Sequence, residues 1–224
     1  MRIASYIDHT FLKPTSVVAD IKKVCQEAQE YGFFAVCMPP PLVRNAVAVL
    51  KESSVKIATV IGFPFGYSVA QAKIAEVRQA IQDGAHELDV VINLVALKSN
   101  AWPYLEKEMT QIMQLAKPAG RLVKVIIESG LLTDEEILQC CEIYTKVGVD
   151  FLKTSTGYAE KGASIAAVQL MRKHLPSTIK IKASGGIRTY EQAVQYVNAG
   201  AERLGCSASV AIVKGESDEG TPAY

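Results

Sequence analysis

Three ionisable residues, Asp89, Lys153 and Lys182, stand inside short, mostly apolar segments that read ELDVV, FLKT and IKIKAS. The lengths and the alternation of these segments are typical of strands, in which successive side chains point to opposite faces. One face of each strand would then carry charge into a protein interior, where an unpaired ion is strongly unfavourable. Charges at such positions require either a structural or a chemical explanation.

The two lysines could supply a nucleophilic amine. A free lysine has a pKa of ~10.4, so nearly every such side chain is protonated at neutral pH. If Lys153 and Lys182 lay on neighbouring strands, roughly 4.8 Å apart, repulsion and partial desolvation would lower the pKa. A neutral Lys153 amine can form a Schiff base, whose protonated form is an electron sink for making or breaking an adjacent carbon–carbon bond. Asp89 could exchange the protons, directly or through water.

A salt-bridge network that fills the interior is the structural alternative. It suffices for Glu87, Lys124 and Lys180, but it accounts less well for Asp89 and the two lysines above. Those three lie toward the C-terminal ends of their strands, which is the end that carries chemistry in parallel barrels. The network would comprise Glu87, Asp89, Glu128, Lys124, Lys153, Lys180 and Lys182.

Eight strand-like segments alternate with stretches of helical periodicity. This alternation predicts a parallel sheet, and eight units in a chain of 224 residues predict a (β/α)₈ TIM barrel in the α/β class. A doubly wound open sheet is the alternative. One domain would span residues 1–224, with a mobile polar tail from about residue 215. The expected strands cover residues 3–7, 33–38, 56–61, 87–91, 122–128, 151–154, 179–184 and 203–206.

Residues that begin and end helices support this division. The capping-box pattern, Ser or Thr followed three residues later by Glu or Gln, occurs at three expected helix starts. Glycines follow four helical stretches, where a left-handed residue commonly ends a helix. The boxes pair Ser68 with Gln71, Thr133 with Glu136 and Thr189 with Gln192, and the glycines are Gly32, Gly84, Gly148 and Gly200.

Small residues cluster directly after the last three expected strands. Free backbone N–H groups in such turns, beside a helix start, form an anion site, and barrels commonly hold phosphate after strands 7 and 8. Taken singly, each glycine could merely permit a tight turn; the paired loops favour a phosphate site. Its candidate residues are Gly157, Gly185, Gly186, Arg188, Gly205 and Ser207.

Composition and motifs exclude several classes of function. A net charge of +1 gives no basic surface for nucleic acid, and no apolar run reaches the ~20 residues of a membrane span. Five cysteines, two of them adjacent, predict free thiols in a reducing compartment, hence a cytoplasmic protein. The three histidines are scattered and the sequence has neither metal-binding nor nucleotide-binding motifs, so no metal or cofactor is expected.

The ordered motifs of the chain resemble the deoxyribose-phosphate aldolase family. The matching stretches are IDHTFLKP (7–14), VIGFPFG (60–66), ELDVVIN (87–93), VKVIIESGLLTDEE (123–136), DFLKTSTGY (150–158) and KASGGIRT (182–189). Together they cover nearly the whole chain, and KTSTG combined with KASGGIR is very specific.

The resemblance implies a metal-independent class I aldolase that reversibly splits 2-deoxy-D-ribose 5-phosphate into acetaldehyde and D-glyceraldehyde 3-phosphate. It places the Schiff-base lysine at Lys153 and the proton-relay pair at Asp89 and Lys182, and it makes Asp8 a supporting residue. Tyr224, the last residue, matches a tail tyrosine that assists proton transfer in the family. The resemblance also implies a homodimer or homotetramer.

Some positions depart from the family, and two other functions stay open. Pro39, in MPPP, stands where the family often has asparagine, which could reshape the pocket rim, and Cys37 is expected to be an apolar filler there. The first alternative function is a Schiff-base lyase for another phosphorylated aldehyde or keto acid. The second is a non-catalytic barrel that binds a phosphate ligand.

Overall fold

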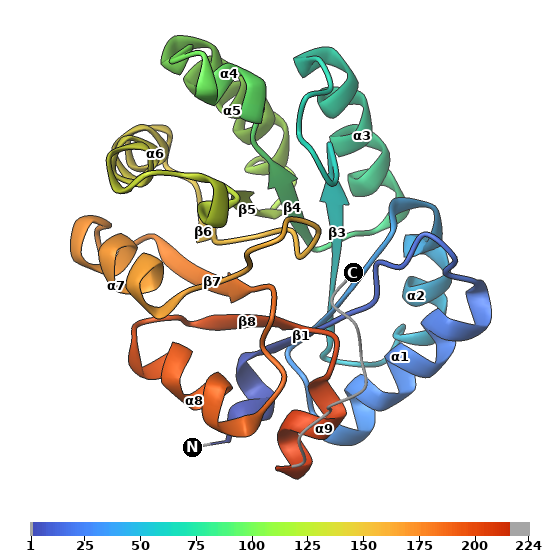
Figure 1. The fold of residues 1–224 in the computed structure, drawn as a ribbon. Coiled ribbons are helices and arrows are strands. Elements are labelled where there is room, and N and C mark those ends of the chain that lie inside the picture. Colours follow the sequence, from blue (N-terminus) through green and yellow to red (C-terminus); the bar gives the residue numbers. More distant parts are fainter. Residues whose placement is uncertain (1, 216–224) are drawn as a thin grey trace.

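The computed structural model describes residues 2–215 and is a closed barrel of eight parallel strands, shown end-on in Figure 1. Each strand pairs with the next, and β8 closes the barrel on β1 through Asp8 opposite Gly205. The TIM-barrel prediction is therefore confirmed, and the open-sheet alternative is excluded. The strands are β1 Ile7–Thr10, β2 Ala35–Met38, β3 Lys56–Ile61, β4 Glu87–Val91, β5 Leu122–Ile126, β6 Phe151–Lys153, β7 Lys180–Ser184 and β8 Arg203–Cys206.

Helices surround the barrel on its outer side (Figure 1). Three short 3₁₀ helices accompany them, at Ile3–Tyr6 (η1), Pro40–Leu42 (η2) and Ser129–Leu131 (η3). The α-helices are α1 Val18–Tyr31, α2 Val43–Val49, α3 Ala70–Asp83, α4 Leu94–Lys98, α5 Trp102–Ala116, α6 Asp134–Val147, α7 Ile165–His174, α8 Tyr190–Asn198 and α9 Ser209–Lys214.

Two apolar clusters follow from the alternation along the strands. The large one lies between the barrel and the helices, and it contains Leu88, Val123 and Ile181, each fully buried. The small one consists of Leu12, Cys37, Ala58 and Val60, with Phe63 packed against it, and it comes from the β1–β3 side. Ionisable side chains occupy much of the remaining interior.

Most of the predicted helix ends are confirmed. Thr133 and Thr189 form capping boxes, with their side chains accepting the N–H groups of Glu136 and Gln192. Gly32, Gly84 and Gly148 end their helices in the left-handed conformation. Gly200, also at positive φ, lies two residues after Asn198, the last residue of α8.

Two local predictions are wrong. Ser68 does not cap α3, because that helix begins at Ala70 with Val69 at the N-cap and no side-chain cap. The first strand is Ile7–Thr10 rather than residues 3–7, which fold mostly as η1. The apolar character of Ile3 and Ala4 is explained by their burial in the large core cluster.

Candidate active site

The barrel interior contains a layer of ion pairs centred on Asp89 of β4. Its Oδ2 atom is 2.8 Å from Nζ of Lys153 on β6 and 2.8 Å from Nζ of Lys182 on β7, and Oδ1 is 2.6 Å from Nζ of Lys124. Lys153 and Lys182 are register partners on adjacent strands, as expected. All four side chains are almost completely excluded from solvent. One carboxylate therefore holds three amines.

A second set of ion pairs lies toward the N-terminal ends of the strands. Arg203 of β8 donates from Nε to Asp8 Oδ1 at 2.8 Å and from Nη2 to Glu87 Oε2 at 2.9 Å. Lys124 bridges the two sets, with Nζ 2.6 Å from Glu87 Oε2. Asp8 Oδ2 lies 2.5 Å from Lys182 Nζ, so Asp8 supports that lysine as the resemblance implied.

The charges of these two sets do not balance if every group is ionised. The acids are Asp8, Glu87 and Asp89, whereas the bases are Lys124, Lys153, Lys182 and Arg203, so four cations face three anions. A surplus buried cation is unfavourable, and the least stabilised base is the one that loses its proton.

The pKa shifts identify Lys153 as that base. Burial lowers the pKa of Lys153, the Asp89 carboxylate opposes this, and the Lys182 cation lowers it further. Burial also acts on Lys182, but Asp8 and Asp89 outweigh it and raise the pKa of Lys182 well above its usual value. Asp89 is likewise buried, yet its lysine neighbours hold its pKa well below the ordinary range. The site thus combines a deprotonation-prone amine, a retained cation and a carboxylate.

Two interior predictions are wrong, and one residue was missed. Glu128 stays outside both sets of ion pairs, because it lies two residues beyond the end of β5 and accepts hydrogen bonds from Thr156 instead. Lys180 does not enter the network, because it is the exposed first residue of β7, where the side chain reaches solvent at the N-terminal end of the barrel. Arg203 supplies the fourth cation instead. The alternation of β8 could have revealed it, since Arg203 lies two residues before Gly205 and shares its inward face.

The loops after β6 and β7 adopt the glycine-dependent conformations that an anion site requires. Gly157, Gly185 and Gly186 have φ values of 88°, 89° and 83°, a region that favours glycine. A side chain on Gly186 would meet open space, whereas one on Gly185 would collide with Gly162. Gly186 therefore borders free volume at the mouth.

Hydrogen bonds fix these two loops to each other and to the segment that follows β5. Thr154 Oγ1 both donates to Ser184 O and accepts from Ser184 N, at 3.1 and 3.0 Å. Thr156 donates through its backbone N–H and its hydroxyl to Glu128, a buried residue held at a φ of 55°. The turn that carries Gly157 is therefore anchored before any ligand binds.

The other three candidate phosphate residues differ from one another in exposure and packing. Ser207 is exposed in the turn after β8, and Arg188 is half-buried in the turn before α8. A side chain on Gly205 would come within 2.8 Å of Ser184 and 3.1 Å of Lys182, so its lack of a side chain makes room for Lys182. That explains Gly205 on packing grounds alone.

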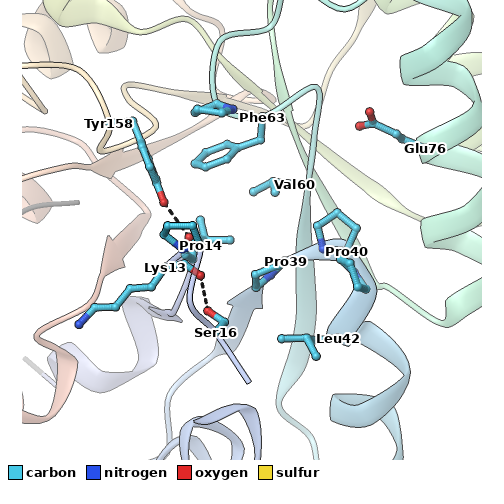
Figure 2. Close-up of a pocket in the computed structure, with 13 residues that line it drawn as sticks. Lys13, Pro14, Ser16, Pro39, Pro40, Leu42, Val60, Phe63, Glu76 and Tyr158 are labelled. Atoms are coloured by element: carbon cyan, nitrogen blue, oxygen red, sulfur yellow. Dashed lines mark hydrogen bonds between the residues drawn. The ribbon is translucent and has the colours of Figure 1, made fainter. Parts of the chain in front are cut away.

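An apolar pocket of about 510 Å³ opens on the β1–β3 side of the mouth (Figure 2). Its wall includes an edge-to-face pair, Phe63 and Tyr158, with ring centroids 5.2 Å apart, and the Tyr158 hydroxyl donates to Leu12 O at 2.7 Å. The pocket is lined by Leu12, Lys13, Pro14, Ser16, Pro39, Pro40, Pro41, Leu42, Val60, Phe63, Pro64, Glu76 and Tyr158.

This pocket adjoins the ionic site. Val60 is the register partner of Asp89 and belongs to the small apolar cluster with Leu12 and Cys37. Burial, with the Asp89 charge in addition, raises the pKa of Cys37 to about 11. Cys37 is thus a buried thiol that fills apolar space, as expected.

Tyr224 lies outside the described residues, as does the tail beyond Gly215. Within residues 2–215, no helix is both long enough and apolar enough to cross a membrane. The same residues contain no group of three or more His, Cys, Asp or Glu side chains that could hold a metal ion.

Comparison with known proteins gives matches along nearly the full chain. The model of the DeoC/LacD family aldolases matches residues 2–214. A deoxyribose-phosphate aldolase of Thermococcus gammatolerans is 48% identical over 217 residues, which cover 96% of each chain. The enzyme of that name from Bacillus mycoides is 47% identical over 224 residues, which cover both chains completely.

A solved structure agrees with these sequence matches. The deoxyribose phosphate aldolase of Aeropyrum pernix, described as having a unique tetrameric structure, superposes with a TM-score of 0.89 at 34% identity. The superposition covers 95% of this chain and 89% of that one.

Proposed function

The chain belongs to the DeoC/LacD aldolase family, and we propose that it reversibly cleaves 2-deoxy-D-ribose 5-phosphate into D-glyceraldehyde 3-phosphate and acetaldehyde. One observation carries the chemistry: Lys153, with its lowered pKa, contacts Asp89 beside the retained cation of Lys182. The substrate follows from the names of relatives that are 47% and 48% identical over nearly the full chain.

The reaction begins at the Lys153 amine. Its lone pair attacks C1 of the ring-opened sugar phosphate, and loss of water gives a protonated imine. Asp89, acting through water and Lys182, accepts the proton of the C3 hydroxyl. The C2–C3 bond then breaks, and its electrons flow to the imine nitrogen while D-glyceraldehyde 3-phosphate leaves. The remaining enamine takes a proton at C2, and water hydrolyses the imine to release acetaldehyde and the free lysine.

The charge count explains why the site favours this covalent chemistry. With Lys153 neutral, three cations face three anions in the two sets of ion pairs. Lys153, which forms the imine, is thus the lysine of these ion pairs that loses its proton most easily. Because the imine itself is the electron sink, the proposed mechanism requires no metal or cofactor, and the chain's own side chains carry out the proton transfers together with water.

We assign the substrate phosphate to the loops after β6, β7 and β8. Gly157, Gly185 and Gly186 support this assignment by their conformations, and Ser207 and Arg188 by their positions in the adjoining turns. Backbone N–H groups in such turns bind a phosphate directly, and Arg188 would add a positive charge to the site.

The apolar pocket suits the other end of the substrate. It lies on the β1–β3 side, whereas the phosphate loops lie on the β6–β8 side, and the Lys153 amine reaches from β6 into the interior between them, where it contacts Asp89 of β4. We propose that the acetaldehyde fragment, which has no polar group besides its carbonyl, faces this pocket. The wall formed by Phe63 and Tyr158 would keep water away from the enamine carbon.

The assembly and the location are proposals as well. The A. pernix relative is described as tetrameric, and we propose that this chain forms a homodimer or homotetramer. All five cysteines are buried and unpaired, which supports a cytoplasmic location. Tyr224 as a proton-transfer residue stays a prediction.

Two measurements test the proposed function. A coupled assay should show release of D-glyceraldehyde 3-phosphate from deoxyribose 5-phosphate, and a panel of other phosphorylated aldehydes and keto acids should show slower turnover. Borohydride reduction in the presence of acetaldehyde should add a two-carbon group to Lys153, detectable by peptide mass spectrometry. An unmodified Lys153 together with no turnover would show that the barrel is a binding protein.

A further inference from the structure

His9 joins three parts of the fold from outside the ionic interior. It is the third residue of β1, and its ring contacts residues of α1 and α9. Nε2 lies 2.8 Å from Glu27 Oε2 on α1, and Nδ1 lies 2.9 Å from Ser209 Oγ at the start of α9. Ser209 is completely buried, and its hydroxyl donates to Cys206 O at 2.9 Å. The proposed reaction uses none of these contacts.

The hydrogen-bond inventory fixes how these groups fit together. The hydrogen bond with His9 lowers the pKa of Glu27, and an ionised carboxylate can only accept, so Nε2 carries a hydrogen. Ser209 Oγ has two partners, because it donates to Cys206 O and also lies 2.9 Å from His9 Nδ1. These contacts link α1, the end of β8 and the start of α9 through the His9 ring.

The contacts enclose one exposed residue. Cys206 and Ser209 are both buried and are tied together through the Ser209 hydroxyl, while Ser207 between them is exposed. Cys206 is also the register partner of His9, so the ring stands beside the end of β8. Ser207 borders the same hollow of about 450 Å³ as His9 and Glu27. The turn around Ser207 is therefore held from the side opposite the barrel axis.

We propose that His9, Glu27 and Ser209 form a brace that positions Ser207 and its backbone N–H for the substrate phosphate. His9 is a positioning residue in this proposal, since it acts through Ser209. The inference rests on the proposed function, because it takes the phosphate site from there. It explains why buried His9 and Ser209 and half-buried Glu27 lie between α1, β1 and α9, where apolar packing would suffice for the fold.

The brace would hold the turn after β8 in place, whereas the turns after β6 and β7 are held by other means. The turns after β6 and β7 use glycines at positive φ and bond directly to each other. The turn at residues 206–209 has no residue at positive φ, and α9, which follows, is short. A turn that is fixed beforehand binds its ligand without a further loss of conformational entropy.

Removing the Ser209 hydroxyl tests the brace. Ser209→Ala should weaken binding of inorganic phosphate, measured by calorimetry, about 3- to 10-fold, which corresponds to one hydrogen bond. KM for deoxyribose 5-phosphate should rise by a similar factor, whereas kcat/KM for unphosphorylated deoxyribose should stay unchanged. Ser99→Ala is the matched control, because it removes a hydroxyl bond to Val95 O at the exposed end of α4 and should alter neither quantity.

Substitutions of His9 separate positioning from simple support of the fold. His9→Asn keeps a hydrogen-bonding group near the place of Nδ1 and should retain most phosphate affinity, whereas His9→Leu should lose as much as Ser209→Ala does. Glu27→Gln should lie between them. Its control is Glu106→Gln, which alters a surface ion pair of 2.7 Å with Lys146 and should leave phosphate affinity unchanged.

The outcomes distinguish this proposal from the proposed function. Equal losses for phosphorylated and unphosphorylated substrate, or phosphate affinity in Ser209→Ala equal to that of the wild type, would overturn the brace. Wild-type protein that fails to cleave deoxyribose 5-phosphate would overturn the proposed function instead. Even then, weaker phosphate binding in Ser209→Ala and His9→Leu would support the brace, and equal binding would refute it.

Discussion

Two buried lysines of this barrel have lowered pKa values, and only one of them lies in the site. Lys153 is inside the barrel near its mouth, whereas Lys73 lies on α3 outside it, with Nζ 2.9 Å from Glu108 Oε2 and 2.8 Å from Val91 O. Burial is the leading cause of the lowered pKa in both. A lowered lysine pKa alone therefore does not identify the nucleophile.

The partners of the two lysines distinguish them. Burial raises the pKa of Glu108, so the Lys73–Glu108 pair shifts toward its two neutral forms. Asp89 instead keeps its charge, because Lys124 and Lys182 remain cationic beside it. Lys153 can thus lose its proton to solvent or a reactant while a carboxylate stays available to accept another. The proposed reaction needs an amine of lowered pKa beside an acid that stays ionised, and the Lys73–Glu108 pair lacks that combination.

Removal of the Lys153 amine should have the largest effect. Lys153→Leu should lower kcat/KM for deoxyribose 5-phosphate by at least about 10⁴-fold, because the other two lysines that contact Asp89 have raised pKa values. Asp89 retains Lys124 and Lys182, so the urea midpoint should stay near that of the wild type. Turnover above one-hundredth of the wild-type rate would show that a different group forms the imine.

Loss of Lys182 should shift the pH dependence as well as the rate. Without that cation, Lys153 loses a repulsive neighbour and Asp89 attracts the Lys153 proton more strongly, so both changes raise the pKa of Lys153. In the wild type, borohydride trapping should fall as pH decreases through the lowered Lys153 pKa. In Lys182→Met this fall should begin at higher pH, with kcat reduced about 10²-fold or more. An unshifted trapping profile would mean that Lys182 does not tune Lys153.

Substitution of Lys73 should affect stability but not the proposed reaction. Lys73→Met leaves Glu108 buried without its partner, so the free energy of unfolding should fall by about 3–5 kcal/mol, measured by urea denaturation. Trapping at Lys153 should keep its wild-type pH profile, because Lys73 is not among the groups that shift the Lys153 pKa. Lys73→Met combined with Glu108→Leu should recover much of the lost stability. A changed profile would show that the two lysines are coupled.

The sequence predicts the barrel and the central residues for a clear physical reason. Alternation within strands places Asp89, Lys153 and Lys182 on inward faces, and parallel strands bring their C-terminal ends to one mouth. The same rule could have yielded Arg203, but a single charge in a four-residue strand gives a weak periodic signal. It also placed Lys180 inside, because alternation reveals the face of a residue but not its depth along the barrel.

Alternation and spacing in the sequence do not predict features that depend on contacts between distant segments. The buried ion pair of Lys73 joins it to Glu108, thirty-five residues away along the chain. His9 meets Ser209 across two hundred residues. Neither pairing follows from local spacing, since each depends on how a particular helix packs on the barrel. Residues 3–7 were likewise misassigned, because an apolar run suits a strand or a buried 3₁₀ turn equally well.

The smallest expected effect concerns the apolar pocket on the β1–β3 side, which neither Lys153 nor Lys73 lines. Half-buried Leu42 lines it. Leu42→Trp should leave addition of acetaldehyde to D-glyceraldehyde 3-phosphate nearly unchanged and reduce kcat/KM for longer aldehyde donors. The reduction should be about fourfold per methylene of the donor, because each buried methylene contributes ~0.8 kcal/mol.

Leu131→Trp is the matched control, since Leu131 lies in η3 after β5 and does not line the pocket. Its donor preference should equal that of the wild type. If Leu42→Trp slowed every donor equally, the pocket would affect Lys153 through the fold and would not hold the aldehyde chain. A selective loss for long donors would place the apolar end of the substrate opposite the phosphate loops, with the Lys153 amine between them.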